Sequence, residues 1–278
     1  MSEFKPKRIG RYSRLFLLVL SEINLLLGAL FFLYPSLAID LWPWPVKELA
    51  VRFLGAIFLA IALGCWSSLR AKGWQRGKIL PVVGGVFFGT TAAITALQIP
   101  SEASNKIILS WIWISFFGPA AVGLLLVIIT HGWYRRPQDN ISTGPVPKVA
   151  SFFFRIQTLV VGVFGTLMLF FPDLAQQQFW PWHVQVPTLQ TFGALFLATC
   201  IATGWASRQG DRGRILALLP LDAVFPALAL LAVGINWDVI TSDSPSGLVT
   251  GVWVFLYSLV AAGSIYLFLT LRKETKSR

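Results

Sequence analysis

Ionisable side chains inside long apolar segments are the first candidates for chemistry in this sequence. Glu22 and Asp222 each lie eight residues beyond a basic residue, Arg14 and Arg214 respectively, which places both about 12 Å along a helix from a basic border. A charge inside a bilayer costs about 2.5–3.5 kcal/mol on insertion scales. We predict that the two carboxyls share a cavity that binds a cation or carries protons, with Arg155 as a counter-charge. The alternative is that each carboxyl pairs with a neighbouring arginine or reaches the near interface.

Helix-breaking residues occur in two apolar segments that occupy equivalent places in the chain. One segment contains Pro81, Gly84 and Gly85, and the other contains Pro220 and Pro226 on either side of Asp222. Paired interruptions of this kind indicate a transport site, because a broken helix exposes backbone groups that can bind a ligand. Close helix packing and simple kinks are the alternative explanation.

Other kinds of chemistry find little support in the sequence. His131 and His183 are expected on opposite membrane faces, which excludes a haem held by two histidines. Cys65 and Cys200 lie in apolar stretches without the spacing of a metal site or a redox pair. There is no phosphate-binding glycine loop, metal-binding histidine pair or nucleophile elbow. We therefore expect no metal and no cofactor. Whether the protein is an enzyme stays open, with the balance against it, because only the intramembrane carboxylates could serve catalysis.

The composition determines which elements must position these residues. Of 278 residues, 55% are hydrophobic and 13% are charged, and the mean hydropathy is +0.68, whereas a soluble domain carries about 25% charged residues. The formal net charge of +11 comes from short clusters at the ends of apolar segments. This pattern indicates topology signals and anionic lipid headgroups rather than nucleic acid. The lipid bilayer is the expected partner.

Eight segments are long enough to cross a hydrocarbon core, which needs about 20 mostly apolar residues. Because lipid cannot satisfy exposed backbone groups, each segment should be a helix, and the fold class should be all-α with eight transmembrane helices. The expected spans are near residues 15–34, 49–66, 79–98, 107–131, 151–171, 188–206, 214–235 and 246–271.

The distribution of Lys and Arg predicts the orientation. The two tails and the loops on their side of the membrane hold 20 of the 23 basic residues, and the other side keeps Lys47, Arg52 and Lys106. Such a bias marks the cytoplasmic side. Both termini are therefore expected in the cytoplasm, and the short loops favour a bacterial plasma (inner) membrane.

An internal duplication divides the chain. Tyr34-Pro35 precedes Trp42-Pro43-Trp44, and Phe171-Pro172 precedes Trp180-Pro181-Trp182. In both copies a Gly-Ala helix begins its motif eleven residues after the last tryptophan, at Gly55 and Gly193. The sequence predicts two parallel four-helix repeats, 1–131 and 151–278, joined by a cytoplasmic linker at 132–150.

The tryptophan loops are the most distinctive local feature. Tryptophan favours the headgroup level of a bilayer, so Trp42, Trp44, Trp180 and Trp182 are predicted to anchor the protein at the outer interface. The alternative is that the paired loops frame an entrance or clamp a lipid or a partner.

The first of these loops resembles a known motif. Leu41-Trp42-Pro43-Trp44-Pro45, with Leu49-Ala50-Val51-Arg52 and Gly55-Ala56, is similar to the LWPWPLTPLTAR motif of uncharacterised bacterial integral membrane proteins. The resemblance covers residues 35–66, and the second copy departs from it with Gln190 at the Arg52 position. The resemblance implies a bacterial membrane protein and no particular activity.

Two functions from different classes fit these features. The first is movement of a small solute or proton, or binding of a lipid, at the interface between the repeats, with Glu22 and Asp222 as the site. The alternative is an accessory or scaffold subunit that packs against a larger membrane complex and has no site of its own. The very short loops and the lack of a soluble domain favour the second.

Overall fold

The protein is a bundle of helices in the computed structural model, which describes residues 9–71, 74–100, 104–132, 146–208, 212–243 and 247–276. No strand occurs within these ranges. Eight helices are long and apolar enough to cross a membrane, so the prediction of an all-α fold with eight spanning helices is confirmed. Most of the expected linker at 132–150 lies outside the described residues.

Each long helix matches one predicted segment and extends a few residues beyond most of them, because polar and basic residues continue the helix past the apolar run. The long helices are α1 (Arg11–Leu33), α3 (Glu48–Arg70), α5 (Ile79–Leu97), α6 (Ser104–His131), α7 (Lys148–Phe170), α9 (Val186–Arg208), α10 (Arg212–Ile235) and α12 (Gly247–Lys276). The short ones are α2 (Pro35–Ala38), η1 (Ile39–Leu41), α4 (Trp74–Gly77), α8 (Pro172–Gln178) and α11 (Trp237–Asp243).

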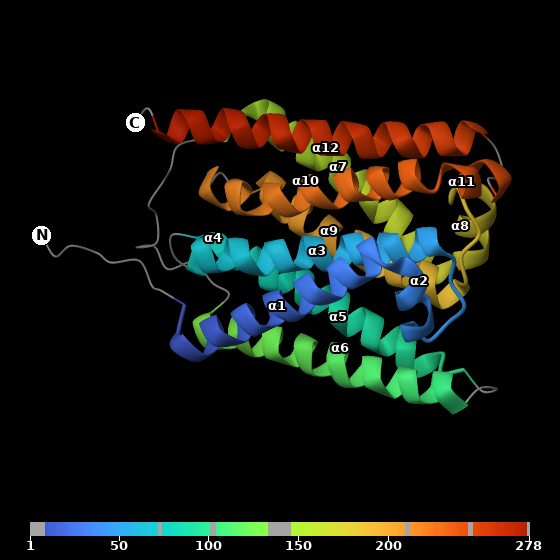
Figure 1. Ribbon diagram of the computed structural model, residues 1–278. Helices are drawn as coiled ribbons and strands as arrows, with labels where there is room; N and C mark the ends of the chain where they lie inside the picture. The colour runs from blue at the N-terminus through green and yellow to red at the C-terminus, as the bar shows by residue number, and fades with distance from the viewer. Residues whose placement is uncertain are drawn as a thin grey trace, which may run out of the picture.

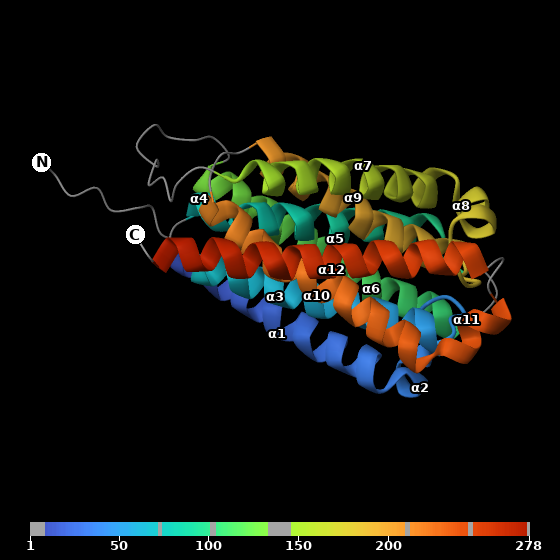
Figure 2. The same cartoon turned by 90° about the horizontal axis from the view of Figure 1, so that it is seen from above.

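The long helices form a centre with two flanks. Helices α3, α5, α9 and α10 lie in the middle, α1 and α6 cover one side, and α7 and α12 run along the opposite side (Figures 1 and 2). The beginning of α1 and the end of α12 lie at the same end of the bundle, which we call the basic end (Figure 1). The other end, with α2, α8 and α11, is called the tryptophan end.

Glycines allow one close helix pair in each half. A methyl group added at Gly28 of α1 would lie 2.8 Å from the backbone nitrogen of Leu59 in α3, and one added at Gly165 of α7 would lie 2.9 Å from the backbone nitrogen of Leu197 in α9. Small residues at such crossings let two backbones approach closely inside a membrane. The two pairs use residues at corresponding places in the two halves.

The two halves also interlock in a reciprocal way. Helix α3 of the first half packs on α10 of the second, and α9 of the second half packs on α5 of the first. Within each half the pairs are again equivalent, α1 with α3 and α5 with α6, then α7 with α9 and α10 with α12. This pairing agrees with the order of the sequence match, and the duplication itself stays a prediction.

The first helix of each half ends in the same backbone geometry. Tyr34 (φ −125°, ψ 57°) and Phe171 (φ −134°, ψ 55°) each precede a proline that opens a short helix. The residue before proline is disfavoured in helical conformation, and proline itself suits the first helical position. These two steps turn the chain at the tryptophan end into the tryptophan loops.

Candidate functional site

The four tryptophans of the loops are buried inside the protein. Trp42 and Trp182 are 0% exposed, Trp180 is 1% exposed and Trp44 is 5% exposed. The indoles therefore do not reach the lipid headgroups, and the expected interface anchors are corrected to core residues. The physical reason is aromatic packing: Trp42 contacts Trp44 and Trp113 edge-on, and Trp180 contacts Trp182 and Trp253 in the same way.

The indole N–H groups of three tryptophans in the first half find hydrogen-bond acceptors within the protein. The indole N–H of Trp42 donates to the Thr188 hydroxyl at 2.9 Å, and that of Trp44 donates to the Gln98 carbonyl at 3.0 Å. Trp113 of α6 donates to the Leu41 carbonyl at 2.7 Å. Each of these three indole donors has thus kept the hydrogen bond that burial requires.

Within the part of the chain that the structure describes, the counterparts in the second half have no such acceptor. Aligned by their loops and by the Trp-x-x-x-aromatic pattern of the last helices, Trp180, Trp182 and Trp253 correspond to Trp42, Trp44 and Trp113. Their indole nitrogens, and the hydroxyl of Tyr257, are buried without a hydrogen-bond partner among the described residues.

A cavity of about 250 Å³ lies inside the second half, between α7, α8, α9, α10 and α12. Its wall is mostly apolar, and Trp180, Trp253 and Tyr257 form part of it. The lining on α12 includes side chains at the protein surface, such as Val252, which is 47% exposed, and Leu248, which is 78% exposed, and the lining on α7 includes the half-buried Val160, Val161 and Phe164. Because α7 packs mainly on α9 and α12 mainly on α10, the cavity opens sideways between α7 and α12.

Asp222 lies in the wall of this cavity, within a polar cluster that joins three helices. The amide of Gln157 in α7 donates to one carboxyl oxygen of Asp222, and the hydroxyl of Ser264 in α12 donates to the other at 2.8 Å. All three side chains are buried, and Gln157 and Asp222 line the cavity. The cluster therefore holds α7, α10 and α12 together around the cavity.

The structure does not bring Glu22 or Arg155 to this cluster. Glu22 is exposed on α1, which lies on the other side of the bundle, and Arg155 is exposed on α7. Among the described residues, the partners of Asp222 are Gln157 and Ser264. The cavity also lies within the second half, whereas the sequence placed the site at the interface between the repeats.

The expected interruptions of the two third helices are not seen. Helix α5 is continuous through Pro81, Gly84 and Gly85, and α10 is continuous through Pro220 and Pro226. Pro81 lies in the first turn of α5. A backbone N–H at this position has no carbonyl acceptor within the helix, so proline costs no hydrogen bond there. Pro226 lies inside α10 and lines the cavity. Because proline has no backbone N–H, the backbone carbonyl of Asp222, four residues earlier, receives no helical hydrogen bond.

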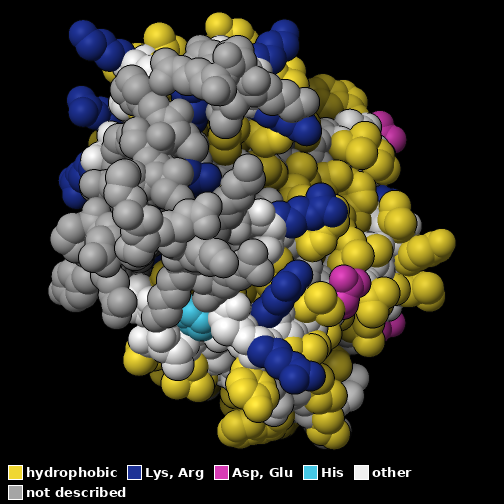
Figure 3. Space-filling model, turned by 90° about the vertical axis from the view of Figure 1, so that its left-hand side faces the viewer, with side chains coloured by type: hydrophobic (Ala, Val, Ile, Leu, Met, Phe, Trp, Pro, Cys, Tyr) yellow, Lys and Arg dark blue, Asp and Glu magenta, His cyan; other side chains and the backbone are white. Residues whose placement is uncertain are grey.

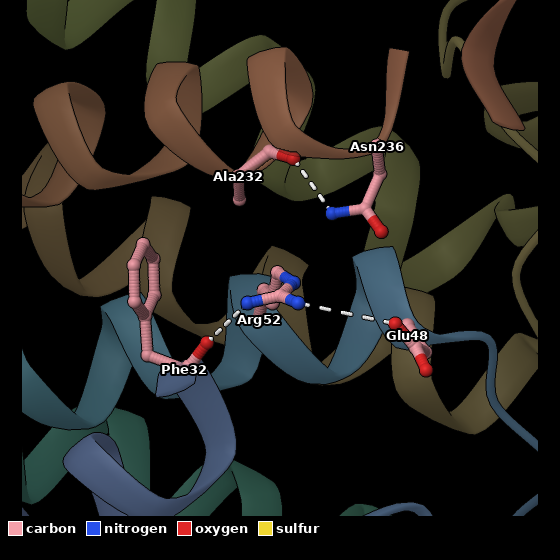
Figure 4. A network of polar contacts seen from close by, with 5 residues as sticks. All are labelled: Phe32, Glu48, Arg52, Ala232 and Asn236. Atoms are coloured by element: carbon pink, nitrogen blue, oxygen red, sulfur yellow. Dashed lines mark hydrogen bonds and ion pairs between the residues drawn. The ribbon is translucent and has the colours of Figure 1, made fainter. Parts of the chain in front are cut away.

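A second polar contact lies at the tryptophan end between the halves. Arg52 of α3 donates to the Phe32 carbonyl at 2.7 Å and lies 3.9 Å from the Glu48 carboxylate, and Asn236 at the end of α10 faces this group (Figure 4). In the second half Gln190 donates to the Leu169 carbonyl at 2.8 Å and accepts from Gln98. Both copies thus use this position to fasten the helix pair, which is a structural use of Arg52.

Sequence reasoning missed Gln157, Ser264, Trp253 and Tyr257. A signal was present for two of them, because the residues matching Gln157 and Ser264 in the first half are Leu20 and Leu124. Val86 of the first half matches Asp222 in the same alignment. The three polar residues of the cluster therefore correspond to three apolar residues in the first half. A position-by-position comparison of the halves would have found the cluster.

Comparison with known protein families, with curated proteins and with solved structures found no match. The geometry of the site therefore has to support the functional conclusion by itself.

Proposed function

We propose that this integral membrane protein binds the hydrocarbon chain of a membrane lipid in the cavity of its second half. The observation that carries the proposal is the largely apolar cavity of about 250 Å³ that opens between α7 and α12. Binding pockets are typically concave and mostly apolar, with a few convergent polar groups. Transport between the repeats and an accessory role in a larger complex stay predictions of the sequence.

The position of the opening supports a lipid as the occupant. The lining residues that reach the protein surface, such as Phe179, Val252 and Leu248, are apolar and 40%, 47% and 78% exposed. A ligand that enters here comes from the hydrocarbon region, where the abundant molecules are lipid chains. The Asp222 carboxyl already accepts from Gln157 and Ser264, so it closes the cavity as a floor, although the amide oxygen of Gln157 has no partner among the described residues.

We propose the orientation on the charge distribution. Lys and Arg side chains gather on the basic end (Figure 3), where exposed residues at helix ends include Arg11, Arg70, Lys148, Arg208 and Arg272. The positive-inside rule assigns such an end to the cytoplasm, here of a bacterial inner membrane. The cavity then extends from the membrane interior towards the outer leaflet. Reporter fusions to the C-terminus test the orientation, and activity of an exported reporter there would overturn it.

Blocking the cavity tests the lipid proposal. Val161 of α7 lines the cavity, whereas Val163, two residues further on, is not part of its wall. We expect Val161→Trp to lose the lipid that co-purifies with the full chain in mild detergent, measured by native mass spectrometry. Val163→Trp is the matched control and should retain it. Equal lipid retention by both variants would contradict the proposal.

A further inference from the structure

Two side chains of opposite charge face outward from helices that are long and apolar enough to cross a membrane. Glu22 of α1 and Arg155 of α7 are both exposed on the surface of the bundle. Within the part of the chain that the structure describes, neither side chain makes a hydrogen bond or an ion pair. Charged groups inside a bilayer are costly and almost always pair with another group or face the interior of a bundle. Each of these two therefore favours contact with an opposite charge from outside the chain.

The two charges lie at similar depths. Glu22 follows the start of α1 at Arg11 by eleven residues, and Arg155 follows the start of α7 at Lys148 by seven. These separations are about 16 and 10 Å of helix rise, and both helices begin at the basic end (Figures 1 and 2). The difference is about one helical turn, which two long side chains can span. An α1 and an α7 that lie side by side in the same orientation would bring the charges together.

The outer faces of α1 and α7 have the same regular spacing. On α1 the outward residues follow one another at steps of four and three, and all are exposed except the half-buried Ala29: Leu15, Val19, Glu22, Leu26, Ala29 and Leu33. Each has an exposed counterpart 137 residues later on α7, from Phe152 to Phe170. This seven-residue repeat is the pattern by which two helices pack along a seam, and charges beside the seam set the partner and its orientation. Arg155 lies beside the seam of α7.

The two faces lie on opposite sides of the bundle, so Glu22 does not reach Arg155 of its own chain (Figures 1 and 2). The residues of α7 that line the cavity lie on another face of that helix, so a contact here is independent of the cavity. A second copy in the same orientation offers a cation for Glu22 on one side and an anion for Arg155 on the other. The charges of one chain thus complement those of the next.

We propose that copies of this protein associate in the membrane through α1 of one copy and α7 of the next, with Glu22 paired to the partner's Arg155. The contact joins two different faces, so it is heterologous and leaves one α1 face and one α7 face open in every dimer. Such a contact continues into a ring or a row of copies. Each contact removes two charges from lipid.

Cross-linking in the membrane tests the proposal. The full chain carries Val19→Cys and Ile156→Cys, which occupy matching places on the two faces, together with Cys65→Ala and Cys200→Ala to remove the native thiols. The membranes are oxidised, and the products are separated by denaturing gel electrophoresis. We expect dimers and longer products. A chain with Val19→Cys alone should give none, and a mixture of the two single-cysteine chains should stop at the dimer.

Charge reversal shows whether the ion pair holds the contact. In the chain with both cysteines, Glu22→Arg and Arg155→Glu should each lower the cross-linked fraction by about tenfold, because each places like charges together. The two substitutions in one chain restore an opposite pair and should recover the fraction, which also shows that the charge-reversed chain folds. Lys148→Glu, an exposed position at the start of α7, is the matched control and should change nothing.

Three outcomes would overturn the proposal. Equal cross-linking in the parent chain and in both single reversals would exclude the ion pair. Dimers of the chain with Val19→Cys alone would show that α1 meets α1. Absence of cross-linked products, or products with a different membrane protein only, would exclude association between copies.

Discussion

The first half of the molecule is filled with aromatic rings where the second half has a cavity, although the helices of the two halves pair in the same order. Phe31 packs against Phe58 and Trp113 with centroid distances of 5.7 and 5.9 Å. Its counterpart Met168 lines the cavity. The comparison shows that side-chain volume and polar pairing, on one arrangement of helices, separate a packed core from a binding site.

The same contrast extends to the third helices. Phe87 and Phe88 of α5 are fully buried and contact Phe117, whereas Ala223 and Val224 hold the matching positions in α10. Val86 beside them is replaced by Asp222. Loss of these two rings and gain of a carboxyl therefore occur on the same turn of the second half, where one ring, Phe225, is gained in place of Gly89.

The largest expected effect concerns what the halves share. Gly28→Ala and Gly165→Ala should each lower the free energy of unfolding by about 3 kcal/mol, because the added methyl group meets backbone across the helix pair and the helices must separate. The measurement is reversible unfolding in mixed detergent micelles. Similar losses in both variants would support equivalent frames, and a loss confined to one half would break the comparison.

The control for this experiment uses glycines in open positions. A methyl group at Gly118 of α6 or Gly251 of α12 would meet nothing within 4 Å. Alanine is the better helix former by about 1 kcal/mol in water. Both control variants should therefore retain the wild-type stability or exceed it slightly.

The helices could be predicted from the sequence because the features that specify them, apolar runs and basic ends, lie within each segment. The apolar runs and their basic ends placed the eight long helices within a few residues, since the bilayer demands long helices of a given length. The glycine pairs Gly28 with Gly55 and Gly165 with Gly193 are visible as small residues. Which helices cross between the halves, as α3 does to reach α10, depends on packing that no single segment contains.

The second prediction concerns the polar cluster. Asp222→Ala should lower the free energy of unfolding by about 2 kcal/mol, because it leaves the Gln157 amide and the Ser264 hydroxyl buried without their acceptor. Val86→Ala, at the matching place in α5, should cost only the packing of two methyl groups. The same unfolding experiment measures both.

A combined variant separates the polar contacts from the scaffold. Giving the second half the first half's residues, Asp222→Val with Gln157→Leu and Ser264→Leu, removes every partner at once, which can be nearly neutral for stability. We expect it to be more stable than Asp222→Ala. A triple variant that unfolds more readily than the single one would show that the three residues do not act as one cluster.

The site was harder to predict than the fold for reasons that these residues illustrate. Asp222 was recognisable because a carboxyl in an apolar helix is costly. The same argument selected Glu22, yet exposure depends on which face of α1 turns inward, and Glu22 lies on the outer one. Residue type alone predicts the tryptophans as interface anchors, whereas their burial results from the loops folding back over the helix ends.

The smallest expected effect separates the tryptophans themselves. Trp42→Phe removes the hydrogen bond to Thr188 and shrinks the ring, whereas Trp180→Phe only shrinks the ring, because its indole nitrogen has no acceptor among the described residues. The first substitution should therefore cost about 1 kcal/mol more than the second in the ligand-free protein. Unfolding of delipidated protein measures this difference. Equal costs for the two substitutions would mean that the indole of Trp180 finds an acceptor within the protein, and the contrast between the halves would then reduce to ring volume.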